Sequence, residues 1–335
     1  MQRDVLATTV AGLVTALAIF AALFWLVDAS EVLAAAGRAD PVLLAAVAGL
    51  MLLWNASWGL ALWNVLQALD IEAPLHTALL VNAAGAFADH ITPFGQAGGE
   101  PVTAWLLNRT TETEYEVSLA SITSLDAINV VPSLTFATVG ALYYTTTAAG
   151  GGLGALPVAV LGVTVGLSVT VTVVWRYRAT VRRPFGVSAG AVGRRVLGVI
   201  PRVSYDAVAE RVDGFTDALR RVGASRRRLV AAVCCSALGW GLQAVGLWVT
   251  FLALESFVPL YVPFFVLPLG KLGSVLPTPG GLGGTEAVNV TLLSVLTGAA
   301  APTIAAAVTI HSVGGYILTT GVGAAAASAL GVRSM

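Results

Sequence analysis

Long runs of apolar residues with almost no charge recur along the whole sequence. Six of them are about 20 residues long or longer, which is enough for a helix to cross a hydrocarbon core of roughly 30 Å. They are Val5–Val27, Pro41–Leu66, Val117–Tyr143, Ala155–Trp175, Leu229–Leu254 and Thr303–Leu330. Because backbone groups in lipid must be paired within the protein, these runs predict an all-α polytopic membrane protein with six full spans. The composition agrees, since 57% of the residues are hydrophobic and 11% are charged.

Two further apolar regions, Leu75–Asn108 and Phe257–Gly298, are each interrupted near the centre. The first break reads Thr92-Pro93-Phe94-Gly95-Gln96-Ala97-Gly98-Gly99-Glu100, and the second reads Thr278-Pro279-Gly280-Gly281-Leu282-Gly283-Gly284-Thr285-Glu286. Pro removes an amide donor and Gly permits positive φ, so a membrane helix is expected to break at both places. The resulting arms are short for a full crossing, which favours two re-entrant helical hairpins. The alternative is that each region forms two short, tilted helices joined by a loop.

Positive charge is concentrated in one segment of a chain whose formal net charge is zero. Thirteen of the 18 Lys and Arg residues lie between Arg176 and Arg228, against four acidic residues. The positive-inside rule places this loop in the cytoplasm. Counting spans outward from it puts both termini in the cytoplasm of a cell-membrane protein. The hairpin at 75–108 then enters from the cytoplasmic face, and the one at 257–298 enters from the outer face.

This count predicts an inverted-repeat-like arrangement within one integral membrane domain, residues 1–335. The first half is 5–175 and the second half is 229–330, with the basic loop 176–228 between them. Opposed broken helices are typical of transporters whose substrate site lies near the midplane. Within the loop, Val203–Val222 has apolar residues near helical spacing, which indicates an interfacial amphipathic helix. Its arginines either mark topology alone or also gather anionic lipid headgroups.

Ionisable residues in apolar sequence are the candidate site residues, because such groups are costly in a membrane and are commonly functional. They are Glu100, Glu286, Asp89, His90, Asp126, Lys271 and His311. Lys271 is the only lysine, and it is expected to pair with a carboxylate or a lipid phosphate, or to form a purely structural ion pair. His311 precedes small residues that suit close helix packing, so its alternative role is a packed, hydrogen-bonded histidine. The expected hinge residues are Pro93, Gly95, Gly98, Gly99, Pro279, Gly280, Gly281, Gly283 and Gly284.

Several classes of chemistry have no sequence support. Cys234 and Cys235 are adjacent, and together with three scattered histidines they give no zinc-like spacing, so neither a metal nor a cofactor is expected. The Gly-rich stretch 280–284 lacks the Gly-Lys-Ser/Thr of a phosphate loop. Nucleic acid is not an expected partner, because the basic residues adjoin membrane spans.

The two breaks and the basic loop together resemble a known family. Gly280–Glu286 has the pattern Gly-Gly-x-Gly-Gly-x-Glu, and the earlier Pro93–Glu100 is followed by Arg109 nine residues on. These features are similar to the transmembrane region of lysylphosphatidylglycerol synthases, over roughly residues 5–330. That family includes stand-alone membrane proteins and domains fused to glycosyltransferases. The first motif departs from it at Pro101, where members more often have a small residue.

The resemblance implies a flippase that moves a modified phospholipid between leaflets, with Arg109 as a further site residue. The aminoacyl-transfer domain of those enzymes has no counterpart in this sequence. We therefore expect a flippase-like transporter, not an enzyme, acting on the headgroup of a phospholipid or a polyprenyl-linked lipid. The alternative is an integral-membrane enzyme or a scaffold subunit that works with a glycosyltransferase on a lipid-linked substrate. Membrane lipids, and a glycosyltransferase or lipid-modifying enzyme, are the expected partners.

Overall fold

The structure, a computed structural model, describes residues 29–92, 96–147, 220–275 and 278–331, with a few isolated positions elsewhere. Within these residues all regular structure is helical, as the sequence predicts. Among the described residues, four helical segments are long and apolar enough to cross a membrane: Pro41–Ala68, Tyr115–Tyr144, Arg226–Ala253 and Ala301–Ala329. They coincide with four of the six expected spans. The other two, Val5–Val27 and Ala155–Trp175, lie outside the described residues, as does most of the loop 176–228.

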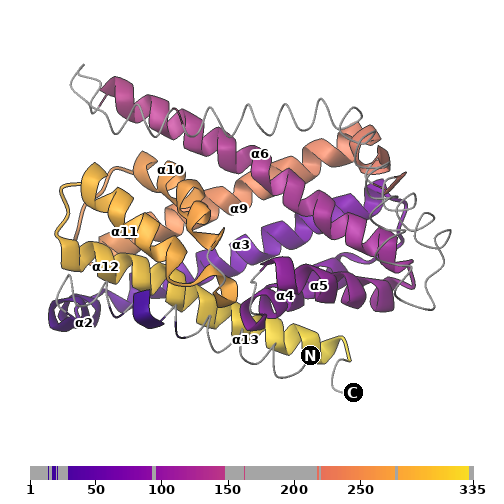
Figure 1. Cartoon of the computed structure of the whole chain (residues 1–335), viewed down its shortest axis with the longest axis horizontal. Coiled ribbons are helices and arrows are strands. Elements are labelled where there is room, and N and C mark those ends of the chain that lie inside the picture. Colours follow the sequence, from indigo (N-terminus) through magenta and orange to yellow (C-terminus); the bar gives the residue numbers. More distant parts are fainter. Residues whose placement is uncertain are drawn as a thin grey trace, which may run out of the picture.

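The helices follow one another in the order shown in Figure 1. They are α2 (Ala29–Gly37), α3 (Pro41–Ala68), α4 (Leu75–Ile91), α5 (Gln96–Thr111), α6 (Tyr115–Thr147), α9 (Arg226–Ala253), α10 (Tyr261–Gly270), the 3₁₀ turns η1 (Lys271–Val275) and η2 (Pro279–Gly281), α11 (Gly284–Leu296), α12 (Ala301–Thr309), the π-helical turn η3 (Ile310–Gly314) and α13 (Gly315–Ala329). Helix α12, the turn η3 and α13 form the last long segment.

The start of helix α3 is stabilised by a side-chain cap. The Asp40 carboxylate accepts hydrogen bonds from the backbone N–H groups of Val42 at 2.7 Å and Leu43 at 3.3 Å, and Pro41 occupies the first helical position. Both features satisfy or remove donors that a helix start leaves unpaired. The backbone N–H of Asp40 also donates to the carbonyl of Ala253 at 2.9 Å. The start of α3 therefore lies beside the end of α9.

Helices α3 and α9 pack along each other, with α4 on α3 and α13 and with α10 on α6 and α11. Small residues allow close approach. A Cβ at Gly239 of α9 would lie 2.5 Å from the Trp58 indole nitrogen, and one at Gly59 of α3 would lie 2.8 Å from Leu79 of α4. Association of helices in lipid depends on such close packing, because burial of apolar surface gives no advantage there.

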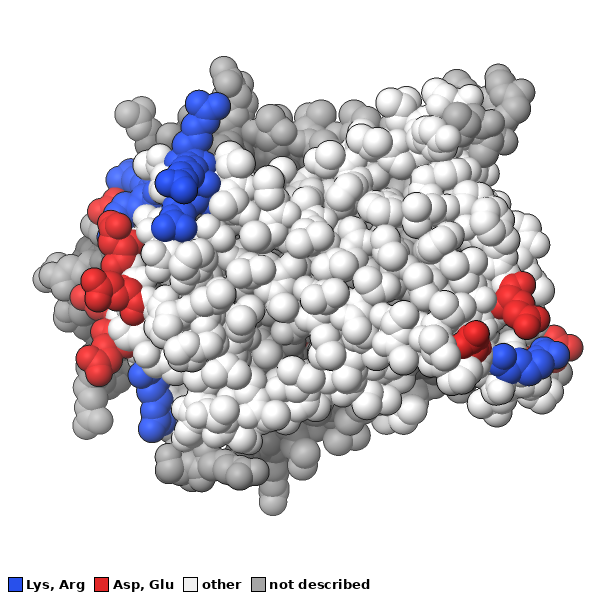
Figure 2. Space-filling view, turned by 180° about the vertical axis from the view of Figure 1, so that it is seen from behind, with Lys and Arg blue, Asp and Glu red and all other residues white. Residues whose placement is uncertain are grey.

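On the face shown in Figure 2, charged side chains gather at the two ends of the bundle, and a broad uncharged surface separates them. Asp40 begins α3 at one end, where Glu255 follows α9. At the other end the Arg221 guanidinium donates to the carbonyl of Leu69 at 3.5 Å. The uncharged surface has the character of a lipid-facing belt, so the bundle has the shape of a membrane-embedded protein.

Each interrupted region consists of two short helices that pack against each other. In the first, α4 has 17 residues and α5 has 16; in the second, α10 has 10 and α11 has 13. At 1.5 Å per residue these arms are about 15–25 Å long, shorter than a hydrocarbon core of roughly 30 Å. The helix breaks expected at both motifs are therefore present. Of the first motif, Pro93 and Gly95 lie outside the described residues.

Candidate functional site

A cavity of about 580 Å³ lies inside the bundle, and parts of both broken regions line it. Its wall includes residues of α3, α4, α5, α6 and α9, together with Ser274, Gly280 and Gly281 near the second break. Five of the seven candidate ionisable residues line it: Asp89, His90, Glu100, Asp126 and Lys271. The fold thus brings together three carboxylates and the only lysine from four separate elements.

Glycines in the first break hold two of these carboxylates close together. Asp89 and His90 occupy the last turn of α4, and Glu100 lies in the first turns of α5. Gly99 packs so tightly on Asp89 that an added Cβ would overlap the backbone and carboxylate of Asp89. A Cβ at Gly98 would likewise lie 2.7 Å from the Thr92 hydroxyl. Because Gly98 and Gly99 have no side chains, the start of α5 can lie directly against the end of α4.

The second break is a turn that only glycine tolerates. Gly280, Gly281 and Gly283 have φ values of 63°, 72° and 89°, a region in which L side chains are strained. The Thr278 hydroxyl closes the turn by donating to the Leu282 carbonyl at 2.8 Å. An extended, flexible linker is thus excluded at this position. The break is a compact, internally hydrogen-bonded structure.

Glu286 belongs to this turn. Its carboxylate accepts a hydrogen bond from the backbone N–H of Gly283 at 2.6 Å, and the residue is only 3% exposed. This is one half of a capping box, in which a residue at the third helical position reaches back to the helix start. Glu286 therefore stabilises the beginning of α11.

Residues of α4, η2 and α13 meet at the junction of the two broken regions. The rings of His90 and Tyr316 stack with centroids 3.9 Å apart, and the Tyr316 hydroxyl donates to the His90 carbonyl at 2.7 Å. The His90 Nδ1 atom is also 2.6 Å from the Thr320 hydroxyl. A Cβ at Gly280 would lie 2.6 Å from the Tyr316 ring and 3.2 Å from the His90 ring. These contacts tie the first break to the second through α13.

A second, smaller cavity of about 110 Å³ adjoins the large one. Trp54, His90, Lys271 and Gly280 line both, so Lys271 stands where the two cavities meet. The smaller cavity contains the other two candidate ionisable residues, Glu286 and His311. Lys271 is thus shared between a carboxylate-rich cavity and a second, distinct polar one.

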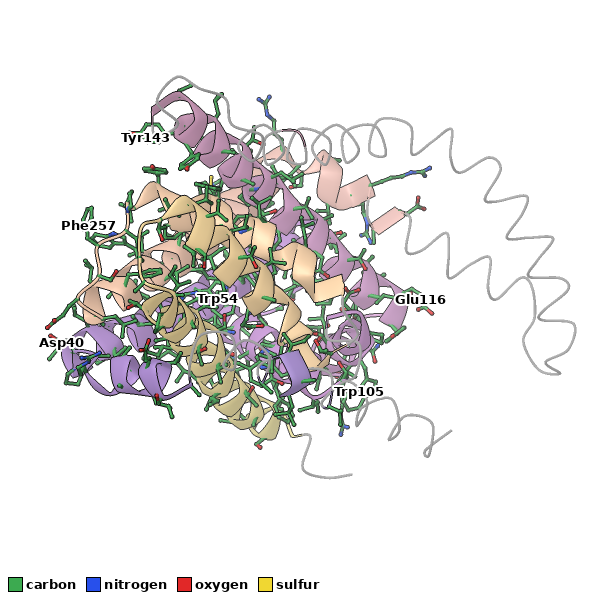
Figure 3. All side chains as sticks on the ribbon, turned by 60° about the vertical axis from the view of Figure 1, so that its left-hand side comes forward. Asp40, Trp54, Trp105, Glu116, Tyr143 and Phe257 are labelled. Atoms are coloured by element: carbon green, nitrogen blue, oxygen red, sulfur yellow. The ribbon has the colours of Figure 1, made fainter. Side chains whose placement is uncertain are left out.

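Aromatic residues that sequence reasoning missed form one wall of the large cavity. The ring centroids of Trp54 and Trp58 are 5.2 Å apart, and those of Trp58 and Trp240 are 6.1 Å apart, both edge to face. Figure 3 shows Trp54 in the middle of the bundle, between the end marked by Asp40 and the end marked by Glu116. Tryptophan in apolar sequence gives no signal of a cavity, because the same residue packs in ordinary helix interfaces.

Not every candidate residue reaches the cavities. Arg109 lies in the last turn of α5, is exposed, and holds its guanidinium 5.6 Å from the centre of the Trp105 ring. It lines neither cavity. Asn129 of α6, by contrast, joins two helices at the cavity wall, since it accepts a hydrogen bond from Ser236 of α9 at 2.6 Å. In the part of the chain that the structure describes, no three His, Cys, Asp or Glu residues form a metal-binding group.

Residues 10–323 match the family model described as the lysylphosphatidylglycerol synthase TM region. The chain belongs to this family. The match includes both breaks and all residues of the two cavities, so the resemblance seen in the motifs holds for almost the whole chain.

Curated relatives are similar over most of the chain. A UPF0104 membrane protein of Methanothermobacter thermautotrophicus is 27% identical over 293 residues, which is 83% of this chain and 79% of the relative. A UPF0104 membrane protein of Pyrococcus horikoshii is 22% identical over 71% of each chain. Glycosyltransferase AglD of Haloferax volcanii is 29% identical over 94% of this chain, but this covers only 53% of AglD. The similarity to AglD therefore concerns about half of that protein.

Proposed function

We propose that this protein is a flippase-like transporter that moves the headgroup of a phospholipid or polyprenyl-linked lipid between the two leaflets. One observation carries the proposal. Two broken regions that are far apart in the sequence contribute to the wall of one cavity of about 580 Å³. That cavity holds ionisable side chains, whereas the middle of the face seen in Figure 2 has none. Ionisable side chains within membrane segments are costly and commonly mark transport pathways, and a headgroup that crosses the membrane requires a polar cavity.

The transport pathway follows from this arrangement. The two broken regions act as re-entrant hairpins from opposite faces within a protein of six spans, with both termini and the loop 176–228 in the cytoplasm. The cavity opens to each leaflet in turn, and the acyl or isoprenoid tails stay in the surrounding lipid. His90 of the first hairpin stacks on Tyr316 of α13, and Gly280 of the second hairpin packs on the same ring, so we expect opening toward one face to displace both hairpins.

The charges in the cavity suit a headgroup that contains a phosphate. Lys271 offers an ammonium to the phosphate, and Asp89, Glu100 and Asp126 interact with water or with a cationic part of the headgroup. The effective dielectric constant inside a membrane protein is lower than that of water, so each of these interactions is stronger than it is in bulk solution. Removing one cavity charge is expected to change which headgroups pass.

Movement of fluorescent phospholipids and polyprenyl-phosphate lipids in proteoliposomes tests the proposal. The native chain is compared with Glu100→Gln, Asp89→Asn and Glu286→Gln at matched reconstitution. Arg109→Gln is the matched control, because it also removes a charge from α5 but at a residue that lines neither cavity. Loss of movement in Glu100→Gln and Asp89→Asn, with Arg109→Gln unchanged, supports transport through the cavity. No movement of any lipid by the native chain contradicts it.

A second candidate function is supported by the similarity to glycosyltransferase AglD, of which this chain matches about half the length. In this reading the chain is a membrane enzyme or scaffold that works with a glycosyltransferase on a lipid-linked substrate. As a scaffold, the chain is predicted to lose function when the loop 176–228 is changed, while Glu100 and Glu286 are dispensable. Co-purification with a glycosyltransferase, together with activity that survives both Gln variants, would favour it over transport.

A further inference from the structure

Five arginines lie where the basic loop joins helix α9: Arg220, Arg221, Arg226, Arg227 and Arg228. The last three form the first turn of α9, and all five except Arg228 are exposed. Figure 2 shows Lys and Arg side chains gathered at its upper left, which is where Figure 1, turned by 180°, places the start of α9. None of these arginines lines either cavity, so the proposed transport site gives them no role.

Local structure does not explain the charges in the first turn of α9. The N-terminal end of a helix carries a partial positive charge, so cations there are unfavourable. Arg220 pairs with Asp217 at 2.9 Å, but among the described residues no acidic side chain forms an ion pair with Arg226 or Arg227. The loop 176–228 holds thirteen of the 18 Lys and Arg residues, so topology alone does not require them at this point of the helix.

Arg226 and Arg227 lie at the top of the exposed apolar side of α9. Val230, Cys234 and Leu238 follow them along the helix, and Val230 and Leu238 are each 55% exposed. Residues three and four positions apart share one face of a helix. The two guanidinium groups therefore adjoin a lipid-facing stripe at the end of the apolar belt. Phospholipid headgroups lie at this level, beside the edge of the hydrocarbon core.

A tryptophan marks the same level. The Arg228 guanidinium is 5.3 Å from the centre of the Trp63 ring, and the Trp63 indole N–H donates to the Ala73 carbonyl at 3.2 Å. Tryptophan is enriched at membrane–water interfaces, because its ring is apolar and its N–H is polar. The protein thus uses Arg228 in a contact of its own, whereas Arg226 and Arg227 are available to a ligand.

We propose that Arg226 and Arg227 bind the headgroup of an anionic phospholipid, which stays at this site as a bound lipid and is not transported. A guanidinium matches a phosphate with two parallel N–H···O bonds, and the apolar stripe below the arginines faces the acyl chains. A zwitterionic lipid fits less well, because its own cation is repelled by the two arginines. The proposal goes beyond the proposed function and does not rest on it, since the site lies outside both cavities.

Native mass spectrometry of the full chain in detergent tests the proposal. The protein is given equal amounts of phosphatidylserine and phosphatidylcholine with the same acyl chains. Both lipids contain a phosphate, but only phosphatidylserine has a net negative charge. An arginine near an anionic headgroup is expected to contribute about fivefold, so the native chain should retain phosphatidylserine over phosphatidylcholine by about 25-fold. The preference should fall as the salt concentration rises, because salt screens exposed charges.

Arg226→Gln and Arg227→Gln are each expected to lower this preference about fivefold. Arg226→Lys and Arg227→Lys keep the charge and should keep most of the preference. Arg38→Gln is the matched control and should leave it unchanged. Arg38 is exposed and precedes α3 by three residues, at the end of the bundle where α9 finishes, and the 28 residues of α9 span about 40 Å. Thermal unfolding of each variant checks that it is folded.

Equal retention of the two lipids by the native chain overturns the proposal and leaves these arginines as topology signals alone. A preference that is unchanged in both folded Gln variants overturns it as well. Lys271→Gln then shows where the lipid is held, because a loss of preference in that variant places it in the large cavity and supports the proposed function instead. A preference that falls in Arg226→Gln and Arg227→Gln upholds the proposal, whether or not any lipid moves in proteoliposomes.

Discussion

Glu286 and Glu100 end two breaks that are similar in sequence, but their carboxylates have different surroundings. That of Glu286 is buried and accepts a hydrogen bond from Gly283 at the start of its own helix. Glu100 is half-buried on the wall of the large cavity, near Asp89 at the end of the neighbouring helix. The glutamate of the second break thus stabilises a turn, whereas the glutamate of the first break lines the large cavity. A shared motif therefore does not imply a shared role.

The glycines of the two breaks differ in the same way. In the second break they provide positive φ values inside a closed turn, whereas Gly98 and Gly99 of the first lie in a regular helix and allow it to touch its neighbour. The first break depends on close packing between two arms, and the second depends on backbone conformation. Substitutions that act on one mechanism and spare the other test this contrast, and we order them by the expected loss of stability.

Glu286→Leu is expected to be the most damaging change. It leaves the buried N–H of Gly283 without its side-chain acceptor, at a cost of about 1–3 kcal/mol. Glu286→Gln keeps an acceptor oxygen, so most of the stability should return. Thermal unfolding of purified protein in detergent measures both. Equal unfolding temperatures for the Leu and Gln variants would show that the hydrogen bond to Gly283 is not what holds the turn.

Gly280→Ala should follow, because it combines strain with a clash. The residue has φ of 63°, and its new Cβ would lie 2.6 Å from the Tyr316 ring. Strain in the left-handed region alone costs about 1–2 kcal/mol. Gly298→Ala, at a residue with no atom within 4 Å of the added carbon, serves as the control in the same unfolding measurement. Similar behaviour of the two variants would contradict a rigid second break.

Tyr316→Phe removes only the hydroxyl that donates to the His90 carbonyl. The ring stack remains, so the expected loss is about 1 kcal/mol. Hydrogen exchange at the end of α4 should rise, because the first break loses one tie to α13. If exchange increases instead around Gly280 and leaves α4 unchanged, the tyrosine supports the second break alone.

Glu100→Gln should have the smallest effect on stability, with no change in unfolding temperature beyond experimental error. Lipid movement should nevertheless fall by about tenfold, the effect of a difference of about 1.4 kcal/mol between the native and substituted cavity. Scrambling rates and unfolding temperatures measured on the same preparations decide the matter. A Glu100→Gln protein that unfolds early yet moves lipid normally would reverse the roles assigned to the two glutamates.

Much of the architecture could be read from the residues alone. The apolar runs at 41–66, 117–143, 229–254 and 303–330 coincide with the four long helices, because an apolar stretch of this length has only the helix as a stable form in lipid. The helix breaks at both motifs were equally readable, since Pro and Gly act on the backbone of their own segment. Ionisable residues also stand out in apolar sequence, and five of the seven candidates line the large cavity, but their role in a site stays a prediction.

Local sequence determined where helices form and break, and which residues are too polar for lipid. Tertiary structure alone decided which of those residues share a space. In the folded chain Asp89, Glu100, Asp126 and Lys271 line the large cavity. Glu286 and His311 line the smaller one, and Arg109 lies at the surface. Tertiary structure also brought Gln243 and Asn289 to the smaller cavity, although nothing in their own segments marks them. The reason is physical: a helix break depends on adjacent residues, whereas a cavity depends on side chains from several helices, which meet only when the helices pack.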